Sequence, residues 1–164
     1  MSSSDRRAHL LYSLLDRCEA HRIAILAWAV LPNHYHILVE VREWTAVGKA
    51  LRAVHGPLAR LWNQGDGTPG RGVWYQYADR AIRSEAHYFT TLNYIHYNPV
   101  KHEWARSPEE WEESSVHGYL ETVGRDWLRK VWTDYPLKDY GSGWDDDVAS
   151  KTEGSAGSRA RCSP

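Results

Sequence analysis

Hydrophobic residues recur at two different spacings along this chain, and the change of spacing separates predicted helices from predicted strands. In residues 8–20 and 44–62, apolar side chains return every three or four positions, as on one face of an amphipathic helix. Residues 23–30 form a nearly continuous apolar run, and residues 34–40 alternate between polar and apolar side chains. The pattern predicts a helix, a two-stranded hairpin with its turn at residues 31–33, and a second helix.

The second predicted helix is followed by a loop and a short aromatic segment. Residues 63–72 carry four glycines and a proline, which predicts a loop, and they lack the Gly-Lys-Ser/Thr ending of a phosphate-binding loop. Residues 73–78 are rich in aromatic side chains, which favours a strand. The helix before them is expected to bury a stripe of Trp44, Val47, Leu51, Val54, Leu58 and Leu61.

A third helix is predicted from Ser84, a good N-terminal cap, to about Tyr97. Pro99 limits it, because the residue before a proline avoids helical angles. At about 100° per residue, Tyr94 and Asn98 fall on the flank of the buried stripe, and Tyr97 falls on the opposite face. The stripe itself consists of Tyr88, Leu92 and Ile95.

The rest of the chain predicts one domain with an extension and a tail. Residues 104–120 read as a helical or irregular segment, and residues 122–140 predict a short helix. From Gly141 onward the chain is rich in Asp, Ser and Gly, which predicts disorder. We therefore divide the chain into a domain at 6–120, an extension packed on it at 121–140, and a disordered tail at 141–164, with a short frayed start at residues 1–5.

Charge and composition narrow the function classes. The net charge is −1, but residues 1–106 carry 13 basic and 9 acidic side chains, whereas residues 107–164 carry 7 and 12. A mildly basic domain permits contacts with a nucleic-acid backbone, and nine tryptophans and ten tyrosines offer stacking surfaces, although most of these rings are expected in the core. Cys18 and Cys162 indicate neither a disulfide framework nor a zinc finger. Without a membrane-spanning apolar run or a signal peptide, we expect a cytoplasmic protein.

Two histidines mark the candidate chemistry. His34 and His36 are two positions apart in the second predicted strand, so both project from the same face of the sheet. Two neighbouring imidazoles can hold a divalent cation, although such a pair is more often surface decoration or a satisfied pair. Ile37 and Val39 point to the other face, toward a core. The pair by itself is therefore weak evidence for a metal site.

A second stretch strengthens the hypothesis. Tyr94 lies four residues, or one helical turn, before Asn98. A tyrosine nucleophile and an oxygen ligand could then face the histidine pair together. His87, near the same flank, could assist proton transfer, although an ordinary exposed histidine is the more common interpretation. His96 falls nearer the buried side and is interpreted as structural.

These motifs closely resemble the HUH single-tyrosine transposases of the IS200-like superfamily, with the REP-associated tyrosine transposases as the nearest branch. The resemblance covers roughly residues 8–120 and rests on several motifs in the same order. They are Leu31-Pro32-Asn33-His34-Tyr35-His36, Val73-Trp74-Tyr75-Gln76, Asp79-Arg80-Ala81-Ile82-Arg83, Tyr94-Ile95-His96-Tyr97-Asn98-Pro99-Val100-Lys101 and Pro108-Glu109-Glu110-Trp111-Glu112-Glu113-Ser114-Ser115.

The resemblance implies a ferredoxin-like α+β fold with an antiparallel sheet and helices on one face. In that family a strand precedes the first helix, and residues 1–5 do not supply it. The resemblance also implies that Tyr94 attacks single-stranded DNA to form a covalent 5′-phosphotyrosine, with Mg²⁺ or Mn²⁺ held by His34, His36 and Asn98. Tyr35 takes a position that is usually aliphatic in the family.

The implied partner is single-stranded or hairpin DNA, with no membrane involvement, and the protein is expected to be a monomer or a homodimer. Candidate DNA contacts are Trp74, Gln76, Arg80 and Lys101. Two other functions stay open from the residues alone. One is a nucleic-acid-binding protein of the same fold that no longer cleaves DNA. The other is a metal-dependent hydrolase that uses water with His34 and His36 and forms no covalent product.

Overall fold

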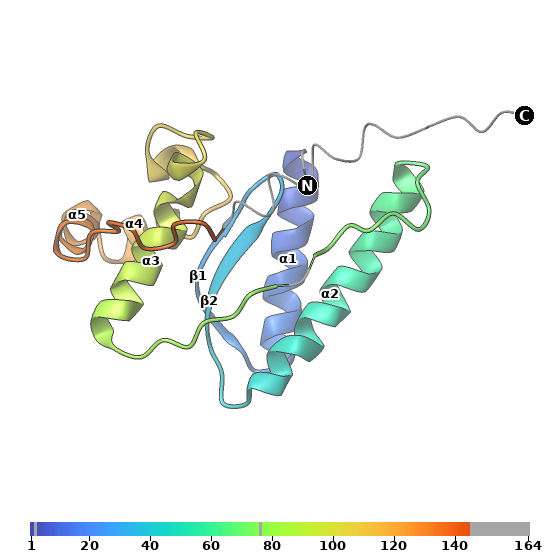
Figure 1. The fold of residues 1–164 in the computed structure, drawn as a ribbon, viewed down its shortest axis with the longest axis horizontal. Coiled ribbons are helices and arrows are strands. Elements are labelled where there is room, and N and C mark those ends of the chain that lie inside the picture. The colour runs from blue at the N-terminus through green and yellow to red at the C-terminus, as the bar shows by residue number, and fades with distance from the viewer. Residues whose placement is uncertain (2, 76, 145–164) are drawn as a thin grey trace, which may run out of the picture.

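The computed structural model describes residues 1, 3–75 and 77–144. This part of the chain forms two strands and five α-helices with one short 3₁₀ helix (Figure 1). In chain order they are α1 (Ser4–Ala20), β1 (Ala24–Val30), β2 (Tyr35–Glu40), α2 (Trp44–Gly65), α3 (Glu85–Lys101), η1 (Pro108–Glu110), α4 (Val116–Thr122) and α5 (Arg125–Asp134). The predicted α+β class is confirmed.

The predicted hairpin forms the centre of the fold. Strands β1 and β2 pair antiparallel, with a bulge between Ile25 and Ala27, and the backbone N–H of Leu31 closes the turn on the carbonyl of His34 at 2.8 Å. The outer edge of β1 is covered by residues 113–115, where Ala29 forms an isolated bridge with Ser114. In the described residues the sheet is two-stranded, and no strand precedes α1.

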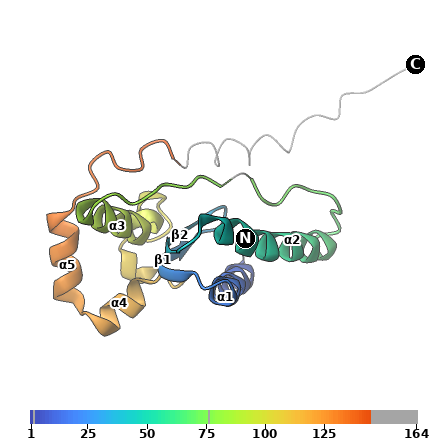
Figure 2. The same cartoon turned by 90° about the horizontal axis from the view of Figure 1, so that it is seen from below.

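Helices pack on both faces of the hairpin, rather than on one face as the resemblance implied. Helices α1 and α2 lie on one side, and α3 lies on the other side together with α4 and α5 (Figures 1 and 2). The reason is the alternation along β2, which sends hydrophobic side chains both ways. Ile37 and Val39 pack into the cluster with α1 and α2, as predicted, and Leu38 packs into the cluster with α3.

Helix α1 begins at Ser4, so the expected frayed start at residues 1–5 is wrong for its last two residues. The Ser3 side chain caps the helix by accepting a hydrogen bond from the backbone N–H of Arg6 at 3.3 Å. Arg6 pairs with Asp66 beyond α2, and Arg7 pairs with Glu113. The helix therefore begins before residue 8, where the apolar pattern used for the prediction starts, and polar contacts hold this first turn.

Helix α2 confirms the amphipathic pattern but corrects its ends. Val47, Leu51, Val54 and Leu58 are buried, as predicted. Trp44 and Leu61, however, are about half exposed, and Trp62 is buried in place of Leu61. The helix also runs three residues further, to Gly65. The indole of Trp62 packs into the core cluster, so the last buried position of the helix is one residue later than predicted.

The link between α2 and α3 crosses from one half of the molecule to the other (Figures 1 and 2). Residues 66–72 form the predicted loop. The strand expected at residues 73–78 is absent from the described residues of that segment, because no neighbouring strand lies beside it to supply ladder hydrogen bonds. Its Trp74 is instead anchored to α2, donating from Nε1 to the His55 carbonyl at 2.8 Å.

The C-terminal half follows the prediction in outline. Ser84 caps α3, accepting from the backbone N–H of His87 at 3.1 Å. The helix continues through Pro99 to Lys101, past the predicted end near Tyr97. The segments 104–120 and 122–140 contain η1, α4 and α5, as expected. Cys18 is buried on α1, and Cys162 lies outside the described residues.

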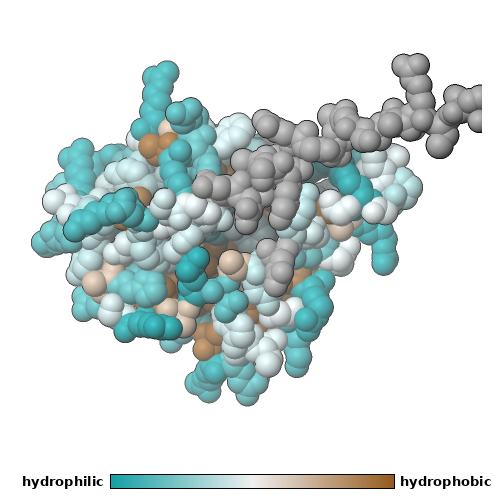
Figure 3. All heavy atoms as spheres, in the orientation of Figure 1, coloured by the Kyte–Doolittle hydropathy of each residue, from teal (hydrophilic) through white to brown (hydrophobic). Residues whose placement is uncertain are grey.

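The face seen in Figure 3 is mostly hydrophilic, with small separate hydrophobic patches. None of the helices in the described part of the chain is both long enough and apolar enough to cross a membrane.

Candidate active site

The two histidines of the motif lie side by side on the face of the hairpin that α3 covers. His34 ends the turn and His36 lies in β2, and their ring centroids are 5.0 Å apart with the planes nearly perpendicular. Tyr35, between them, points to the opposite face, where its hydroxyl contacts His55 Nε2 at 2.8 Å. The alternation predicted from the sequence therefore positions both imidazoles toward the same helix.

Asn98 of α3 meets the first of these histidines. The distance from His34 Nε2 to Asn98 Oδ1 is 2.9 Å, and His34 Nδ1 lies 2.8 Å from Asn33 Oδ1. Both contacts are with amide oxygens, which only accept hydrogen bonds, and a neutral imidazole carries one proton, so it can donate in only one of the two contacts at a time. When the proton is on Nδ1 and is donated to Asn33, the Nε2 lone pair points toward Asn98 and is available to a cation between the two groups.

The donor set fits a divalent cation. Two ligands that meet at a right angle on one ion, with bonds of about 2.1 Å, lie roughly 3 Å apart, and His34 Nε2 and Asn98 Oδ1 have this spacing. Within the described residues, no three His, Cys, Asp or Glu side chains are grouped to hold an ion. The amide oxygen of Asn98 is the group beside His34 that could act as a third donor with the two imidazoles.

Tyr94 lies beside the same cluster. Its ring centroid is 5.2 Å from that of His36 in an edge-on contact, and Lys101 Nζ donates to its hydroxyl at 3.4 Å. The sequence predicted a position on the flank of α3, but Tyr94 is only 2% exposed and Asn98 is fully buried. Because α3 stays helical through Asn98, the two side chains are one turn apart, as the pattern required.

The burial of Tyr94 has a clear cause in residues 140–144, which we call the cover. Tyr140 and Trp144 contact the Tyr94 ring edge-on, at centroid distances of 5.8 and 5.1 Å. Gly141 lies so close that a Cβ on it would overlap the ring. Residues 141–144 of the cover belong to the segment predicted to be disordered, whereas Tyr140 is the last residue of the predicted extension. That prediction is wrong for 141–144, and residues 145–164 lie outside the described part.

The cover is attached to α3 by a closed set of hydrogen bonds. The backbone N–H of Arg83 donates to His87 Nδ1, so His87 Nε2 carries a proton and donates to the Tyr140 hydroxyl at 2.9 Å. That hydroxyl donates to Thr91 Oγ1 at 2.6 Å, because the Thr91 hydroxyl itself donates to the His87 carbonyl. His87 thus holds the cover in this arrangement.

Two candidate DNA contacts also hold the cover. Lys101 Nζ donates to the Gly141 carbonyl at 3.0 Å, and the Arg80 guanidinium lies over the Trp144 ring at 3.8 Å. Trp74, by contrast, is half-buried and stacked on His55, so the structure does not bring it to the Tyr94 cluster. Gln76 lies outside the described residues.

The other candidates on α3 lie away from the cluster. Tyr97 packs edge-on against Trp132 of α5, and burial raises the pKa of its hydroxyl. His96 is fully buried, with Nε2 at 3.1 Å from Ser115 Oγ, and burial lowers its pKa to about 4. This placement agrees with the structural role inferred for His96.

Sequence reasoning missed several neighbours of the cluster. The His102 ring lies 4.9 Å from the His34 ring, centroid to centroid. Its signal was present, because His102 is one turn after Asn98, but the predicted helix ended too early. Tyr140 and Trp144 gave no signal, since nothing in their local pattern relates them to Tyr94.

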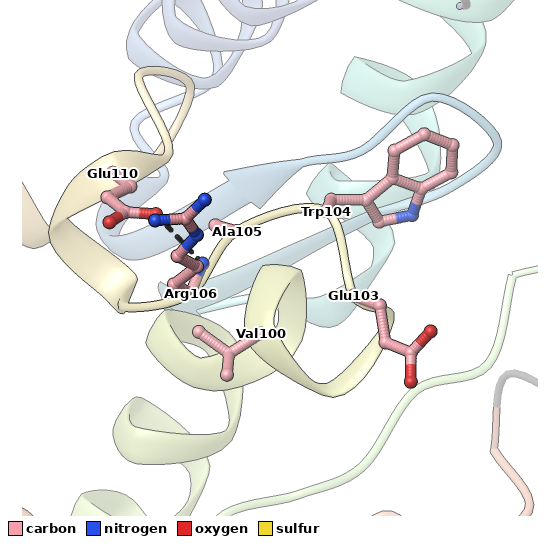
Figure 4. A pocket seen from close by; sticks show the side chains of 6 residues that line it. All are labelled: Val100, Glu103, Trp104, Ala105, Arg106 and Glu110. Atoms are coloured by element: carbon pink, nitrogen blue, oxygen red, sulfur yellow. Dashed lines mark hydrogen bonds between the residues drawn. The ribbon is translucent and has the colours of Figure 1, made fainter.

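A surface pocket of about 380 Å³ lies just beyond α3 and is separate from this cluster (Figure 4). Trp104 stands at one end of it, and Arg106 and Glu110 stand at the other, with the Arg106 backbone N–H donating to Glu110 Oε2. None of the predicted catalytic or metal-binding residues lines this pocket.

Comparisons with known proteins agree with the motifs. No family model matches the chain. A REP-associated tyrosine transposase of Escherichia coli is 29% identical over 143 residues, which cover 82% of this chain and 68% of that protein. A relative from Haemophilus influenzae with the same family name is 27% identical over 111 residues, covering 61% of this chain and 62% of its own length.

The fold has a counterpart among solved structures. A REP-associated tyrosine transposase bound to a REP hairpin superposes with a TM-score of 0.62 at 22% identity, over 74% of this chain and 72% of that one. This likeness confirms the fold, and the two curated relatives confirm the resemblance carried by the motifs. The chain is thus similar to REP-associated tyrosine transposases, in agreement with the resemblance that its motifs carry to the IS200-like single-tyrosine superfamily.

Proposed function

We propose that this protein cleaves and rejoins single-stranded DNA through a covalent bond to Tyr94, assisted by a divalent cation. The observation that carries the proposal is the contact of Tyr94 with His36, next to the His34–Asn98 pair, in a relative of tyrosine transposases. The solved relative is bound to a REP hairpin, which supports a hairpin with single-stranded flanks as the substrate class.

In the proposed step, the phenol oxygen of Tyr94 attacks the phosphorus of one phosphodiester. The bond from phosphorus to the 3′ oxygen breaks, and the phenol proton is balanced by the proton that this oxygen takes up. The products are a 5′-phosphotyrosine and a free 3′-hydroxyl. Because the new ester keeps the phosphate activated, a 3′-hydroxyl can attack it and rejoin a strand.

The protein's own groups would lower the barrier at two points. A tyrosine phenol, with an ordinary pKa of about 10, is a weak nucleophile at neutral pH. The Lys101 ammonium next to the Tyr94 hydroxyl would stabilise the developing phenolate. His34, His36 and Asn98 would hold Mn²⁺ or Mg²⁺, which would polarise the scissile phosphate. Two imidazoles and an amide oxygen suit Mn²⁺ better than Mg²⁺.

Access to Tyr94 requires the cover to move. A phosphodiester cannot reach a hydroxyl whose residue is 2% exposed under Gly141 and Trp144. Arg80 and Lys101, which contact the cover, are cations that a DNA backbone would also attract. Binding of the strand and release of the cover would therefore compete for the same side chains.

A denaturing gel tests the proposal. The protein is incubated with Mn²⁺ and labelled hairpin oligonucleotides that have single-stranded flanks. We expect a labelled band that survives boiling and is lost in Tyr94→Phe. Tyr97→Phe is the matched control, because it removes a hydroxyl from the same helix on the side packed against Trp132, and it should keep the band. Loss of the band in Tyr97→Phe only would contradict the assignment.

The burial of Tyr94 favours one second candidate, a DNA-binding protein that does not cleave. On this alternative, filter binding detects the hairpin complex, yet no covalent band forms even in a variant that ends before residue 140. The hydrolase alternative would instead give cleaved DNA without any covalent band, and cleavage would persist in Tyr94→Phe.

A further inference from the structure

Helices α1 and α3 end in the same kind of turn. After α1, Arg22 has a φ of +57°, and after α3, Glu103 has a φ of +59°. In each turn the next residue, Ile23 or Trp104, donates its backbone N–H to the carbonyl five residues earlier, at 2.8 and 2.9 Å. Both are Schellman turns, in which glycine usually takes the left-handed position because a side chain is disfavoured there.

The hydrophobic residue after each turn is exposed to a different extent. Ile23 is 4% exposed and packs in the core with Cys18, so the turn after α1 serves burial. Trp104 is 51% exposed. The turn after α3 therefore holds a large indole at the surface, at the cost of a glutamate in the left-handed region. A strained turn that presents an aromatic ring to solvent indicates a ligand for that ring.

The indole stands at one end of the surface pocket of about 380 Å³ (Figure 4). Arg106 and Glu110 stand at the other end, and Glu103 is a second carboxylate of the lining. Two carboxylates and one guanidinium do not suit a phosphate, because the carboxylates would repel it. An aromatic ring near hydrogen-bonding groups of both kinds suits a flat, neutral ligand with a polar edge, and a nucleobase has this chemistry.

The polar end of the pocket favours guanine among the four bases. A carboxylate only accepts hydrogen bonds, and a guanidinium only donates them. On its Watson–Crick edge, guanine has two neighbouring donors, N1–H and the N2 amino group, next to the acceptor O6, whereas the other three bases each have a single donor group. The Arg106 backbone N–H positions the Glu110 carboxylate by donating to its Oε2 at 2.9 Å. Glu110 can then accept from both guanine donors while the Arg106 side chain donates to O6.

The pocket adjoins the candidate active site through the end of α3. His102 caps this helix, and its ring lies 4.9 Å from that of His34, centroid to centroid. Trp104 follows His102 closely in the chain, so a strand bound at the cluster would reach the indole within a few nucleotides. We propose that the pocket binds one unpaired guanine of the DNA strand, stacked on Trp104 and hydrogen-bonded by Glu110 and Arg106. The inference rests on the proposed function, because this guanine belongs to the DNA that the function requires.

Hairpin binding, measured by fluorescence anisotropy without a divalent cation, tests the inference. The labelled hairpin carries single-stranded thymine flanks in which one guanine is moved through successive positions. We expect guanine at one position to tighten binding by at least about fivefold, the lower end of the effect of one stacked base. Inosine, which lacks the N2 amino group, should lose most of this gain at that position.

Two variants and a matched control locate the effect. The gain from guanine should be absent in Trp104→Ala and reduced in Glu110→Gln, because an amide oxygen replaces only one of the two carboxylate oxygens. Trp44→Ala is the control, since Trp44 of α2 is 48% exposed, about as much as Trp104, and it does not line the pocket. Its gain from guanine should equal that of the parent.

The outcomes separate this inference from the proposed function. An equal gain in the parent and in Trp104→Ala would overturn the inference, and so would the absence of a guanine-sensitive position in the parent. Loss of the gain in Trp44→Ala as well would overturn it too, because the effect would then not belong to the pocket. A gain from guanine without a Tyr94 adduct would leave the inference standing and contradict the cleavage reaction. An adduct without any gain from guanine would do the reverse.

Discussion

The two faces of the hairpin bury histidines in opposite ways. On the face covered by α1 and α2, His55 is stacked on Trp74 at 4.2 Å, contacts the Tyr35 hydroxyl, and has a pKa lowered to about 4 by burial. On the face covered by α3, His34 and His36 are in an edge-on ring contact, with Asn98 beside His34 and the Tyr94 ring beside His36. The same residue type stabilises the fold on one side and forms the candidate site on the other.

The difference follows from what surrounds each ring. His55 is packed against the rings of Tyr35 and Trp74, and its burial there favours the neutral form. His34 lies against the side-chain oxygens of Asn33 and Asn98, whose lone pairs a cation can share, and His36 lies beside it. A histidine count alone therefore does not locate a site. The face of the strand and the partner element decide the role.

The largest expected effect is the loss of the covalent product when a ligand is removed from the α3 face. His36→Ala should lower adduct formation by more than about a hundredfold, beyond the loss typical of an outer-shell residue. Thermal unfolding should change less, because the His36 side chain is only partly buried. His55→Gln is the control on the other face, and equal adduct loss in both variants would contradict the division between the faces.

A core truncation on the α1 and α2 face should lower the stability of the fold and leave cation binding unchanged. Leu14 is 1% exposed in the cluster between these helices, so Leu14→Ala should lower the free energy of unfolding by about 2–5 kcal/mol. Urea unfolding measures this loss. At a temperature where the variant stays folded, its Mn²⁺ affinity should equal that of the parent. A large change in affinity would mean that the two faces are coupled.

A smaller effect should appear in the pH dependence of stability. Burial lowers the folded-state pKa of His55 and His96 to about 4, whereas an exposed histidine titrates near 6.5. Between these values the unfolded chain binds more protons, so the free energy of unfolding should fall as the pH drops from about 6.5 to 4. The two histidines together should contribute a few kcal/mol.

Urea unfolding at pH 7, 6 and 5 measures the slope of the free energy of unfolding against pH. His96→Asn removes one of the two titrating groups and keeps a polar atom toward Ser115, so its stability should depend less on pH than that of the parent. His9→Ala, at an exposed position, should leave the slope unchanged. An unaltered slope in His96→Asn would mean that folding does not shift the pKa of His96.

The sequence predicted local features well where one local rule decides the outcome. Alternation in β2 set the directions of His34 and Tyr35, and the Ser84 cap set the start of α3. The aromatic segment at 73–78 was mistaken for a strand because a strand needs a partner that no local pattern reveals. Gly141 contacts Tyr94, which lies 47 positions earlier in the chain. Because no local pattern reveals such a contact, the composition of the segment alone predicted disorder.

The smallest expected effect concerns Gly141, the point where this long-range contact is tightest. Its φ of +77° lies in the left-handed region, and a Cβ there would overlap the Tyr94 ring, so Gly141→Ala should displace the cover. We expect adduct formation to rise severalfold, because Tyr94 becomes accessible, while the free energy of unfolding falls by about 1 kcal/mol or less. The denaturing gel measures the first change, and urea unfolding measures the second.

Gly67→Ala is the matched control for this variant. Gly67 also has a positive φ, of +65°, but a Cβ on it would meet no atom within 4 Å, so it carries the same backbone strain without the overlap. Its adduct rate should equal that of the parent. If Gly141→Ala lowers the adduct rate instead, the cover positions Tyr94 for attack rather than blocking it. The face of the hairpin that holds the candidate site would then include residues 140–144 as part of its machinery.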